Sequence, residues 1–205
     1  MSLLRQLFEK PWHAGRGRAS DLPEGSAFVL PTPILGLRVL LAVITVLFAL
    51  MVVAYGDRMG VSDWRPFPEP ALLWLNTLIL AFSSLAWHWA CINVRRGELD
   101  GVKTGLLLGG GSAIAFLIGQ YWAWQQMIAL GYYADSNPAN AFFYLVTAAH
   151  GLHLLGGLVA WGRTATRVWR GDDLSKVGMS VELCAIYWHF LLVVWLVLFV
   201  LLLFT

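Results

Sequence analysis

Five long apolar stretches divide this chain, and short polar segments separate them. They cover residues 36–55, 71–94, 104–130, 140–162 and 181–204. A helix rises 1.5 Å per residue, so about 20 apolar residues cross the ~30 Å hydrocarbon core of a bilayer. Every stretch reaches that length. The pattern predicts an all-α integral membrane protein built as a bundle of five transmembrane helices.

The composition supports this interpretation. The 205 residues are 59% hydrophobic and 13% charged, with a net charge of +2, and the mean hydropathy is +0.67. A soluble domain is about half apolar and a quarter charged, so an ordinary soluble enzyme is excluded. The small net charge argues against nucleic-acid binding. Cys91 and Cys184 lie within apolar stretches, and no disulfide framework is expected.

Basic residues gather on one side of the predicted bundle. The N-terminal tail and the second and fourth connections carry Arg5, Lys10, Arg16, Arg18, Arg95, Arg96, Lys103, Arg163, Arg167, Arg170 and Lys176. The opposite connections carry only Arg58 and Arg65. Because cytoplasmic loops are enriched in lysine and arginine, we predict a cytoplasmic N-terminus and a C-terminus on the outside.

This topology divides the chain into two regions. Residues 1–35 form a cytoplasmic tail, in which Ser2–Trp12 is a candidate interfacial amphipathic helix and a loosely ordered tail is the alternative. Residues 36–205 form the five-helix membrane domain. The tail is too short for a typical soluble domain. Function is therefore expected within the helices or on a partner protein.

Polar side chains within the predicted helices are functional candidates, because placing them in a bilayer is costly. His150, His153 and Gly157 fall on one helix face, which predicts a closely packed neighbouring helix and hydrogen bonds from the imidazoles across that interface. Haem ligation is the alternative, with His88, His153 or His189 supplying ligands from facing helices.

No catalytic, cofactor-binding or metal-binding set is predicted on this chain. A pair of histidines three residues apart, without cysteine or carboxylate nearby, is a weak zinc signal. Glu182 and His189 lie seven residues apart, but the central parts of the predicted helices contain no carboxylate, which argues against proton conduction. A transporter needs a site in broken helices, and close packing explains its one candidate, Gly109–Gly111, more simply.

Three segments of the chain resemble subunit III of the haem-copper oxidases. They are FFYLVTAAHGLHLLGG at residues 142–157, VELCAIYWHF at 181–190 with Val193, Val194 and Trp195 beyond, and Leu75-Asn76-Thr77 followed by Trp89-Ala90 and Gly97. Order and spacing agree over roughly residues 71–204, and five helices match the shorter form of that family. The residues that carry the resemblance are Asn76, Trp89, His150, Gly151, His153, Gly157, Glu182, Trp188, His189 and Trp195.

The resemblance implies a non-catalytic accessory subunit of a respiratory oxidase in the bacterial cytoplasmic (inner) membrane. Subunit III of that family packs against and stabilises catalytic subunit I, binds phospholipid and supports proton uptake, while haem and copper reside on partner subunits. Arg95, Arg96, Arg163 and Glu182 are the candidate contacts to lipid head groups. Two alternatives stay open: a subunit III-like protein associated with nitric oxide reductase, and a free-standing membrane haem protein.

The sequence departs from the pattern of this family at three places. Leu191-Leu192 stand where the family usually has valine and aspartate, and Cys91-Ile92 stand where paired histidines often occur. The helix around Thr45 lacks the intramembrane glutamate common in the family. Each departure removes a polar group, so the resemblance does not extend to a carboxylate-mediated proton role.

Overall fold

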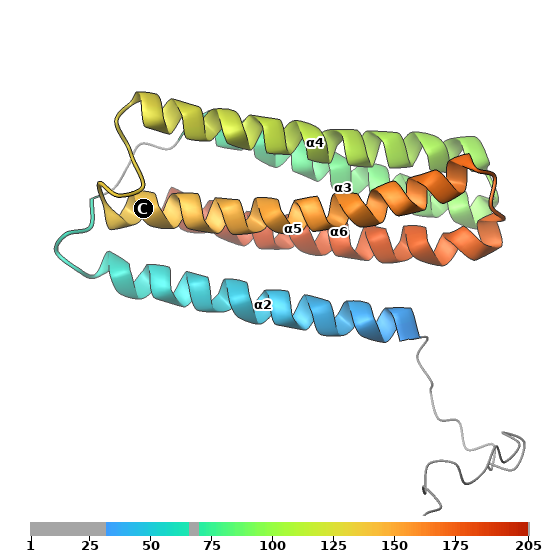
Figure 1. Cartoon of the computed structure of the whole chain (residues 1–205), viewed down its shortest axis with the longest axis horizontal. Coiled ribbons are helices and arrows are strands. Elements are labelled where there is room, and N and C mark those ends of the chain that lie inside the picture. Colours follow the sequence, from blue (N-terminus) through green and yellow to red (C-terminus); the bar gives the residue numbers. More distant parts are fainter. Residues whose placement is uncertain (1–31, 66–69, 205) are drawn as a thin grey trace, which may run out of the picture. The chain divides into compact units, whose positions relative to one another are not determined.

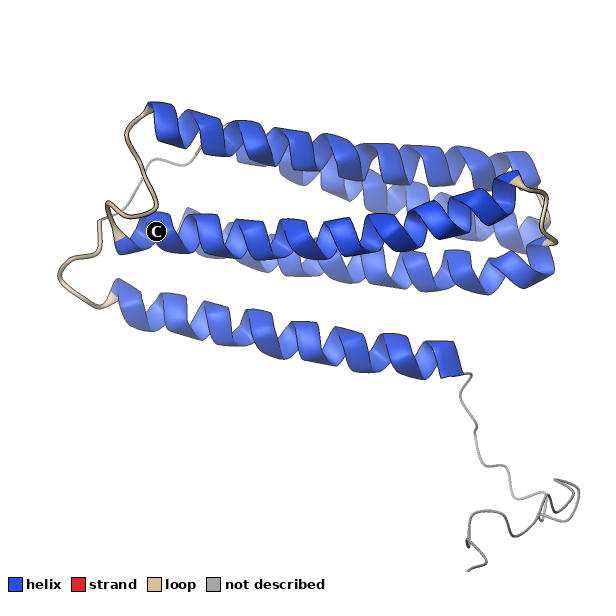
Figure 2. Cartoon of the chain, viewed as in Figure 1, coloured by secondary structure: helices blue, strands red, loops and turns tan. Residues whose placement is uncertain are grey.

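The computed structural model describes residues 32–65 and 70–204, and its regular secondary structure in these ranges is entirely helical. The helices are α2 (Thr32–Met59), α3 (Leu72–Arg96), α4 (Leu99–Ala129), α5 (Pro138–Trp169) and α6 (Leu174–Leu203), as Figures 1 and 2 show. Each contains a segment long and apolar enough to span a membrane. The prediction of an all-α protein with five membrane-spanning helices is confirmed. The segment Ser2–Trp12 lies outside the described residues.

Each helix extends beyond its apolar stretch at one end or at both. The largest extensions place the end of α5 at Trp169 rather than 162 and the start of α6 at Leu174 rather than 181, and α4 starts at Leu99 rather than 104. Polar residues such as Asp100 and Arg167 occupy these extensions. Helical backbone hydrogen bonding continues past the hydrocarbon core into the head-group region, where polar side chains are solvated. Hydropathy alone therefore underestimates helix length.

Glycines allow α3 and α4 to pack closely. Gly101, Gly105 and Gly109 recur every four residues along α4, so they share the helix face that meets α3. A Cβ atom added to Gly105 would lie 2.7 Å from the Cβ of Ala90, and one on Gly109 would lie 2.8 Å from Nε1 of Trp87. Small residues at such positions bring membrane helices into backbone contact.

The remaining helices complete a four-helix ring with α2 beside it. α3 contacts α4 and α6, α5 contacts α4 and α6, and α2 contacts only the α5–α6 pair to any extent. α2 is apolar around its whole circumference and buries just Ile44, Phe48 and Tyr55 among its described residues. It is therefore the least enclosed helix, lying along α5 in Figure 1.

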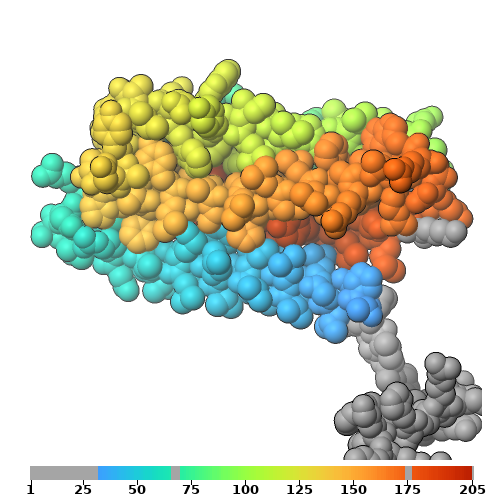
Figure 3. Space-filling model, in the orientation of Figure 1, coloured from blue at the N-terminus to red at the C-terminus, as the bar shows by residue number. Residues whose placement is uncertain are grey.

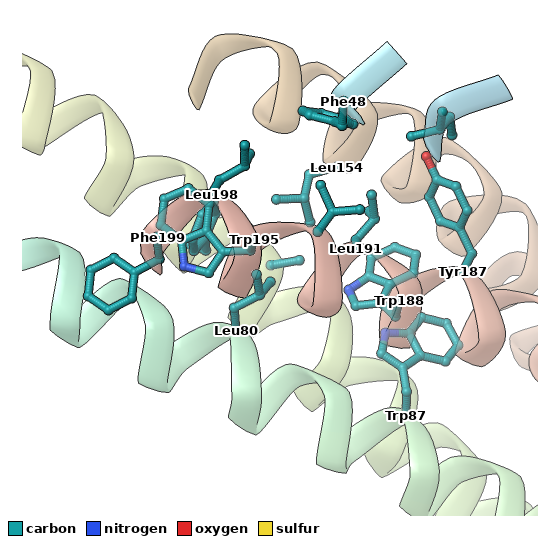
Figure 4. Packing of buried hydrophobic residues seen from close by; sticks show 14 of the residues in the cluster. Phe48, Leu80, Trp87, Leu154, Tyr187, Trp188, Leu191, Trp195, Leu198 and Phe199 are labelled. Carbon is teal, nitrogen blue, oxygen red and sulfur yellow. The ribbon is translucent and has the colours of Figure 1, made fainter. Parts of the chain in front are cut away.

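Aromatic side chains fill the centre of the ring. Trp87, Trp188, Trp195 and Phe116 are fully buried. The ring centroids of Trp87 and Trp188 lie 4.8 Å apart, and Trp195 meets Phe116 edge to face at the same separation. Figure 4 shows the three indoles projecting from α3 and α6 into one packed layer. Phe116 and Trp195 of this layer pack against His150.

Hydrogen bonds of the Asn137 side chain join the connection after α2 to the start of α5. The Asn137 side chain donates a hydrogen bond to the backbone carbonyl of Arg65 and accepts one from the Arg65 N–H. The same side-chain oxygen accepts from the N–H of Ala139 at 3.2 Å, so Asn137 also caps α5. These hydrogen bonds tie the connection after α2 to the first turn of α5.

Candidate functional site

His150 lies at the centre of the bundle with no solvent-exposed surface. Its ring is surrounded by Trp195 at 5.1 Å, Phe116 at 5.7 Å and Phe48 at 6.4 Å between centroids. Neither ring nitrogen has a hydrogen-bond partner among the described residues. The hydrogen bond expected from His150 across a helix interface is therefore not made. The reason is that aromatic rings rather than polar groups face it from α2, α4 and α6.

His153 lies on the same helix one turn later and also bonds no neighbouring helix through its ring. Its Nδ1 contacts the carbonyl oxygen of Ala149, on its own helix, at 2.7 Å. The cross-helix bond at this position is made by backbone: Tyr187 donates its hydroxyl to the His153 carbonyl at 3.0 Å. A Cβ on Gly157 would lie 2.9 Å from the Tyr187 ring, so α6 does approach α5 closely here.

His189 is the histidine that links two helices. Its Nδ1 hydrogen-bonds the hydroxyl of Ser84, which is buried on α3. His88 follows Ser84 by one turn of α3, and its ring centroid lies 6.2 Å from that of His189. Sequence reasoning assigned no role to Ser84. Its spacing of four residues from His88 was the available signal, since such residues share a helix face.

A shallow groove between α3 and α6 runs from these histidines toward the ends of the two helices. It has a volume of about 220 Å³, and its lining includes His88, Cys91, Arg95, Glu182 and His189. Arg95 and Glu182 form an ion pair at 3.3 Å, with both side chains well exposed. An exposed pair of this kind contributes at most about 1 kcal/mol. The arrangement is a polar strip on an otherwise apolar surface.

The geometry of this strip does not fit a haem between His88 and His189. The groove is smaller than the ~300–1,000 Å³ typical of small-molecule sites, and a porphyrin is a large ligand. The hydrogen bond between Ser84 and His189 also engages Nδ1 of His189 and holds α3 and α6 together beside this groove. Within residues 32–65 and 70–204, no three ligating side chains are grouped for a metal ion.

The glycine run in α4 does not interrupt the helix. α4 is continuous from Leu99 to Ala129. Gly109 and Gly110 are buried, and a Cβ on Gly110 would lie 2.2 Å from the indole ring of Trp161. Gly109 and Gly110 therefore serve close packing, and α4 is not the broken helix that a transporter site requires.

The other residues that carry the family resemblance lie in several environments. Trp188 and Trp195 are buried in the aromatic layer, and Gly151 is buried on α5. Trp89 is exposed on the outer surface of α3. Asn76 is buried and donates to the Gln120 side-chain oxygen on α4 at 3.4 Å. The buried members of this group pack between helices, and the group does not converge on one pocket.

Hydrogen bonds between side chains on different helices were the feature that sequence reasoning missed most. Trp195 donates to the Thr77 hydroxyl at 2.9 Å, and Trp124 donates to the Thr147 hydroxyl at 3.0 Å. Threonine is common in apolar stretches because its hydroxyl can bond the backbone of its own helix, so it gave no distinct signal. Thr77 makes such a bond as well, to the Leu73 carbonyl.

The unpartnered nitrogens of His150 lead to a stability prediction. Phenylalanine has a similar shape without the nitrogens, so His150→Phe removes two unsatisfied buried polar atoms. We expect the free energy of unfolding to be unchanged or raised, by up to about 2 kcal/mol. Thermal unfolding in mild detergent measures it. Phe116→His, the reverse change in the same cluster, should lower the unfolding temperature. A clear loss of stability in His150→Phe would contradict the packing described here.

Comparison with known proteins gives a consistent result. A sequence model of the family described as cytochrome c oxidase subunit III matches residues 52–205. Cytochrome c oxidase subunit 3 of Thermostichus vulcanus is 29% identical over 177 residues, which cover 82% of this chain and 85% of that protein. The protein of the same name from Synechocystis sp. is 30% identical over 149 residues, covering 70% and 63%. That of Corynebacterium diphtheriae is 25% identical over 158 residues, covering 75% and 77%.

Proposed function

Because this chain belongs to the cytochrome c oxidase subunit III family, we propose that it is an accessory subunit of a respiratory haem-copper terminal oxidase. In this proposal the chain packs against catalytic subunit I within the membrane and stabilises it. It has no redox centre and no catalytic residue. The helix-packing roles of its intramembrane polar residues support this function.

Exposure of His88 is the observation that carries the proposal. His88 is exposed on α3, eight residues before Arg96, and so lies about 12 Å from the end of the helix. Its ring centroid lies 6.2 Å from that of His189, and its ring makes no hydrogen bond to the described residues. An imidazole facing lipid at this depth is costly, and phosphate head groups lie too far away to bond it. A second membrane protein with a hydrogen-bonding side chain at the same depth would satisfy it.

The surface of α2 provides the contrast. Its large exposed side chains are aliphatic, among them Val43, Leu47 and Leu50. Lipid tails solvate such a surface at no cost in free energy. Polar side chains within the membrane are costly to expose to lipid tails, so they favour contact with another protein. The α3–α6 face at the level of His88 and His189 is therefore the face that we assign to subunit I.

Haem and copper belong to the partner subunits in this proposal. His150 is enclosed by aromatic rings, and His189 is engaged with Ser84. The second candidate function is a free-standing haem protein, for which the 6.2 Å approach of His88 and His189 is the one favourable observation. The small volume of their groove weighs against it.

The proposed location is the bacterial cytoplasmic membrane, with the arginine-rich end of the bundle facing the cytoplasm. The junctions α3–α4 and α5–α6 lie at one end of the bundle in Figure 1. Arg95, Arg96 and Arg163 are exposed near these junctions, and Glu182 pairs with Arg95. Anionic phospholipid head groups attract basic side chains at this level. We propose these four residues as head-group contacts.

Co-purification tests this function. Tagged chain isolated from its native membrane in mild detergent should retain a large haem-bearing subunit, identified by mass spectrometry and by its visible spectrum. His88→Leu should weaken the association about five- to thirty-fold, because an intramembrane hydrogen bond is worth about 1–2 kcal/mol. Leu78→Ala, at an exposed aliphatic position on the same helix, is the matched control and should leave the haem-to-chain ratio unchanged.

Three other outcomes separate the alternatives. Isolation of a monodisperse chain without a haem-bearing partner contradicts the proposal. A Soret band on the chain alone, abolished by His153→Leu or His189→Leu, supports the free-standing haem protein. Recovery of a nitric oxide reductase as the partner supports the other alternative, a subunit III-like protein associated with that enzyme.

A further inference from the structure

A second groove lies between α2 and the α5–α6 pair, and it is built differently from the polar strip. It has a volume of about 410 Å³, within the range of small-molecule sites. Leu40 and Ile44 line it from α2, and Gly156 and Ala160 from α5. The small side chains on α5 leave the space open. Figure 3 shows α2 lying along α5, with part of α6 visible in the hollow between them.

His153 lines this groove, and its hydrogen bonding defines what can bind there. A carbonyl oxygen only accepts, so the contact from Nδ1 to the Ala149 carbonyl requires Nδ1 to carry the proton. In the neutral imidazole, Nε2 then has a free lone pair and acts as an acceptor. No group in the described part of the chain is recorded as a partner of Nε2. The groove therefore offers one hydrogen-bond acceptor.

The other polar groups of the lining are already engaged. The Tyr187 hydroxyl donates to the His153 carbonyl, and Figure 4 shows this hydroxyl directed away from Trp188. The Cys184 sulfur lies 3.6 Å from the Thr164 hydroxyl. The lining contains no aspartate, glutamate, lysine or arginine. A ligand that matches this lining is uncharged and mostly apolar, and it has one hydroxyl to donate.

The depth of His153 excludes a phospholipid head group as that donor. His153 lies at the middle of the 32-residue helix α5, about 24 Å from either end. A charged phosphate at this depth would lie far from the membrane–water interface, where phospholipid head groups are solvated, and would be costly to desolvate. A phospholipid tail could fill the groove, but it would leave Nε2 unpaired. A single hydroxyl is much cheaper to bury once it is hydrogen-bonded.

We propose that this groove binds a neutral lipid with a hydroxyl head, whose hydroxyl donates to Nε2 of His153 while its apolar body lies between α2 and α6. The groove is lined by residues of this chain alone and shares none of them with the polar strip.

A matched pair of probes tests the proposal on the full chain in lipid nanodiscs. The probes are 11-bromoundecan-1-ol and its methyl ether, which differ only in the hydroxyl hydrogen that can be donated. Bromine quenches tryptophan fluorescence on contact, and Trp188 lines the groove. The alcohol should reach half-maximal quenching at a concentration about three- to ten-fold lower than the ether, as expected for one hydrogen bond.

Three variants assign the signal to the groove. His153→Leu should remove the difference between alcohol and ether. Gly156→Leu should fill the groove and abolish saturable quenching by both probes, because a Cβ there meets no atom within 4 Å and the side chain can enter the open space. Gly111→Leu, a glycine on α4 with equal freedom, should behave as the unsubstituted chain.

Several results would overturn the proposal. Equal quenching by alcohol and ether in the unsubstituted chain rules out the hydrogen bond without reliance on any variant. Persistence of the difference in His153→Leu places the acceptor elsewhere. Absence of saturable quenching by both probes indicates that a phospholipid tail or nothing occupies the groove.

Discussion

Gly105→Leu is expected to prevent α3 and α4 from assembling in their native arrangement. Even the Cβ atom would lie 2.7–2.9 Å from the Cβ, Cα and backbone nitrogen of Ala90. Because backbone cannot move aside as a flexible side chain can, the two helices would have to separate and lose the contacts along their whole seam. We expect a loss of stability beyond the usual 1–3 kcal/mol of overpacking, measured as a fall in unfolding temperature or in the yield of monodisperse protein.

Gly111→Leu provides a matched control for this experiment. Gly111 lies on the same helix, but a Cβ there has no atom within 4 Å. Leucine is a better helix former than glycine by up to about 1 kcal/mol, so this variant should be as stable as the parent or more stable. If the two leucine variants were equally stable, the close approach of α3 and α4 would be refuted.

Trp195→Ala has the second largest expected effect. Trp195 is fully buried, packs against Phe116, His150 and Phe199, and donates to the Thr77 hydroxyl. Lipid tails are as apolar as the protein interior, so the loss arises mainly from packing contacts and the cavity left behind. We expect a decrease of about 3 kcal/mol in the free energy of unfolding, measured by denaturation in detergent.

Two further variants separate the contributions of Trp195. Trp195→Phe keeps an aromatic ring but removes the donor to Thr77, so it should lose less stability than Trp195→Ala. Leu196→Ala removes a side chain that is 41% exposed on the adjacent position of α6. It should change stability by no more than about 0.5 kcal/mol. An equal effect of Trp195→Ala and Leu196→Ala would show that the aromatic layer does not hold α6 in place.

The intramembrane histidines show which features of the structure residue spacing can predict and which it cannot. Spacing placed His150, His153 and Gly157 on one face of α5, and the structure has His150 and Gly157 buried on that helix. Spacing did not reveal what lies opposite: His150 faces aromatic rings, and His153 turns back to its own helix. Helix periodicity defines a face, but the partner of a face depends on the rotation and offset of another helix.

The same distinction explains why the bond between Ser84 and His189 was not anticipated. The two residues are 105 positions apart, on helices α3 and α6. By size alone, a short apolar side chain would fit at position 84 as well as serine does. The residue type at this position therefore gave no reason to expect a hydrogen bond to His189. Their meeting depends on the path of three intervening connections and on how α6 packs against α3.

By itself, the sequence determined that the chain is all-helical and membrane-spanning, how many spans it has, and the family to which it belongs. The first two follow because lipid offers no partners to backbone N–H and C=O groups, so each apolar segment must satisfy them within a helix. Only the tertiary structure decided that His88 is exposed, that His150 is enclosed, and that α2 leaves a groove at His153. These outcomes depend on helix rotation, and α2 is apolar on all sides and thus carries no pattern that specifies its rotation.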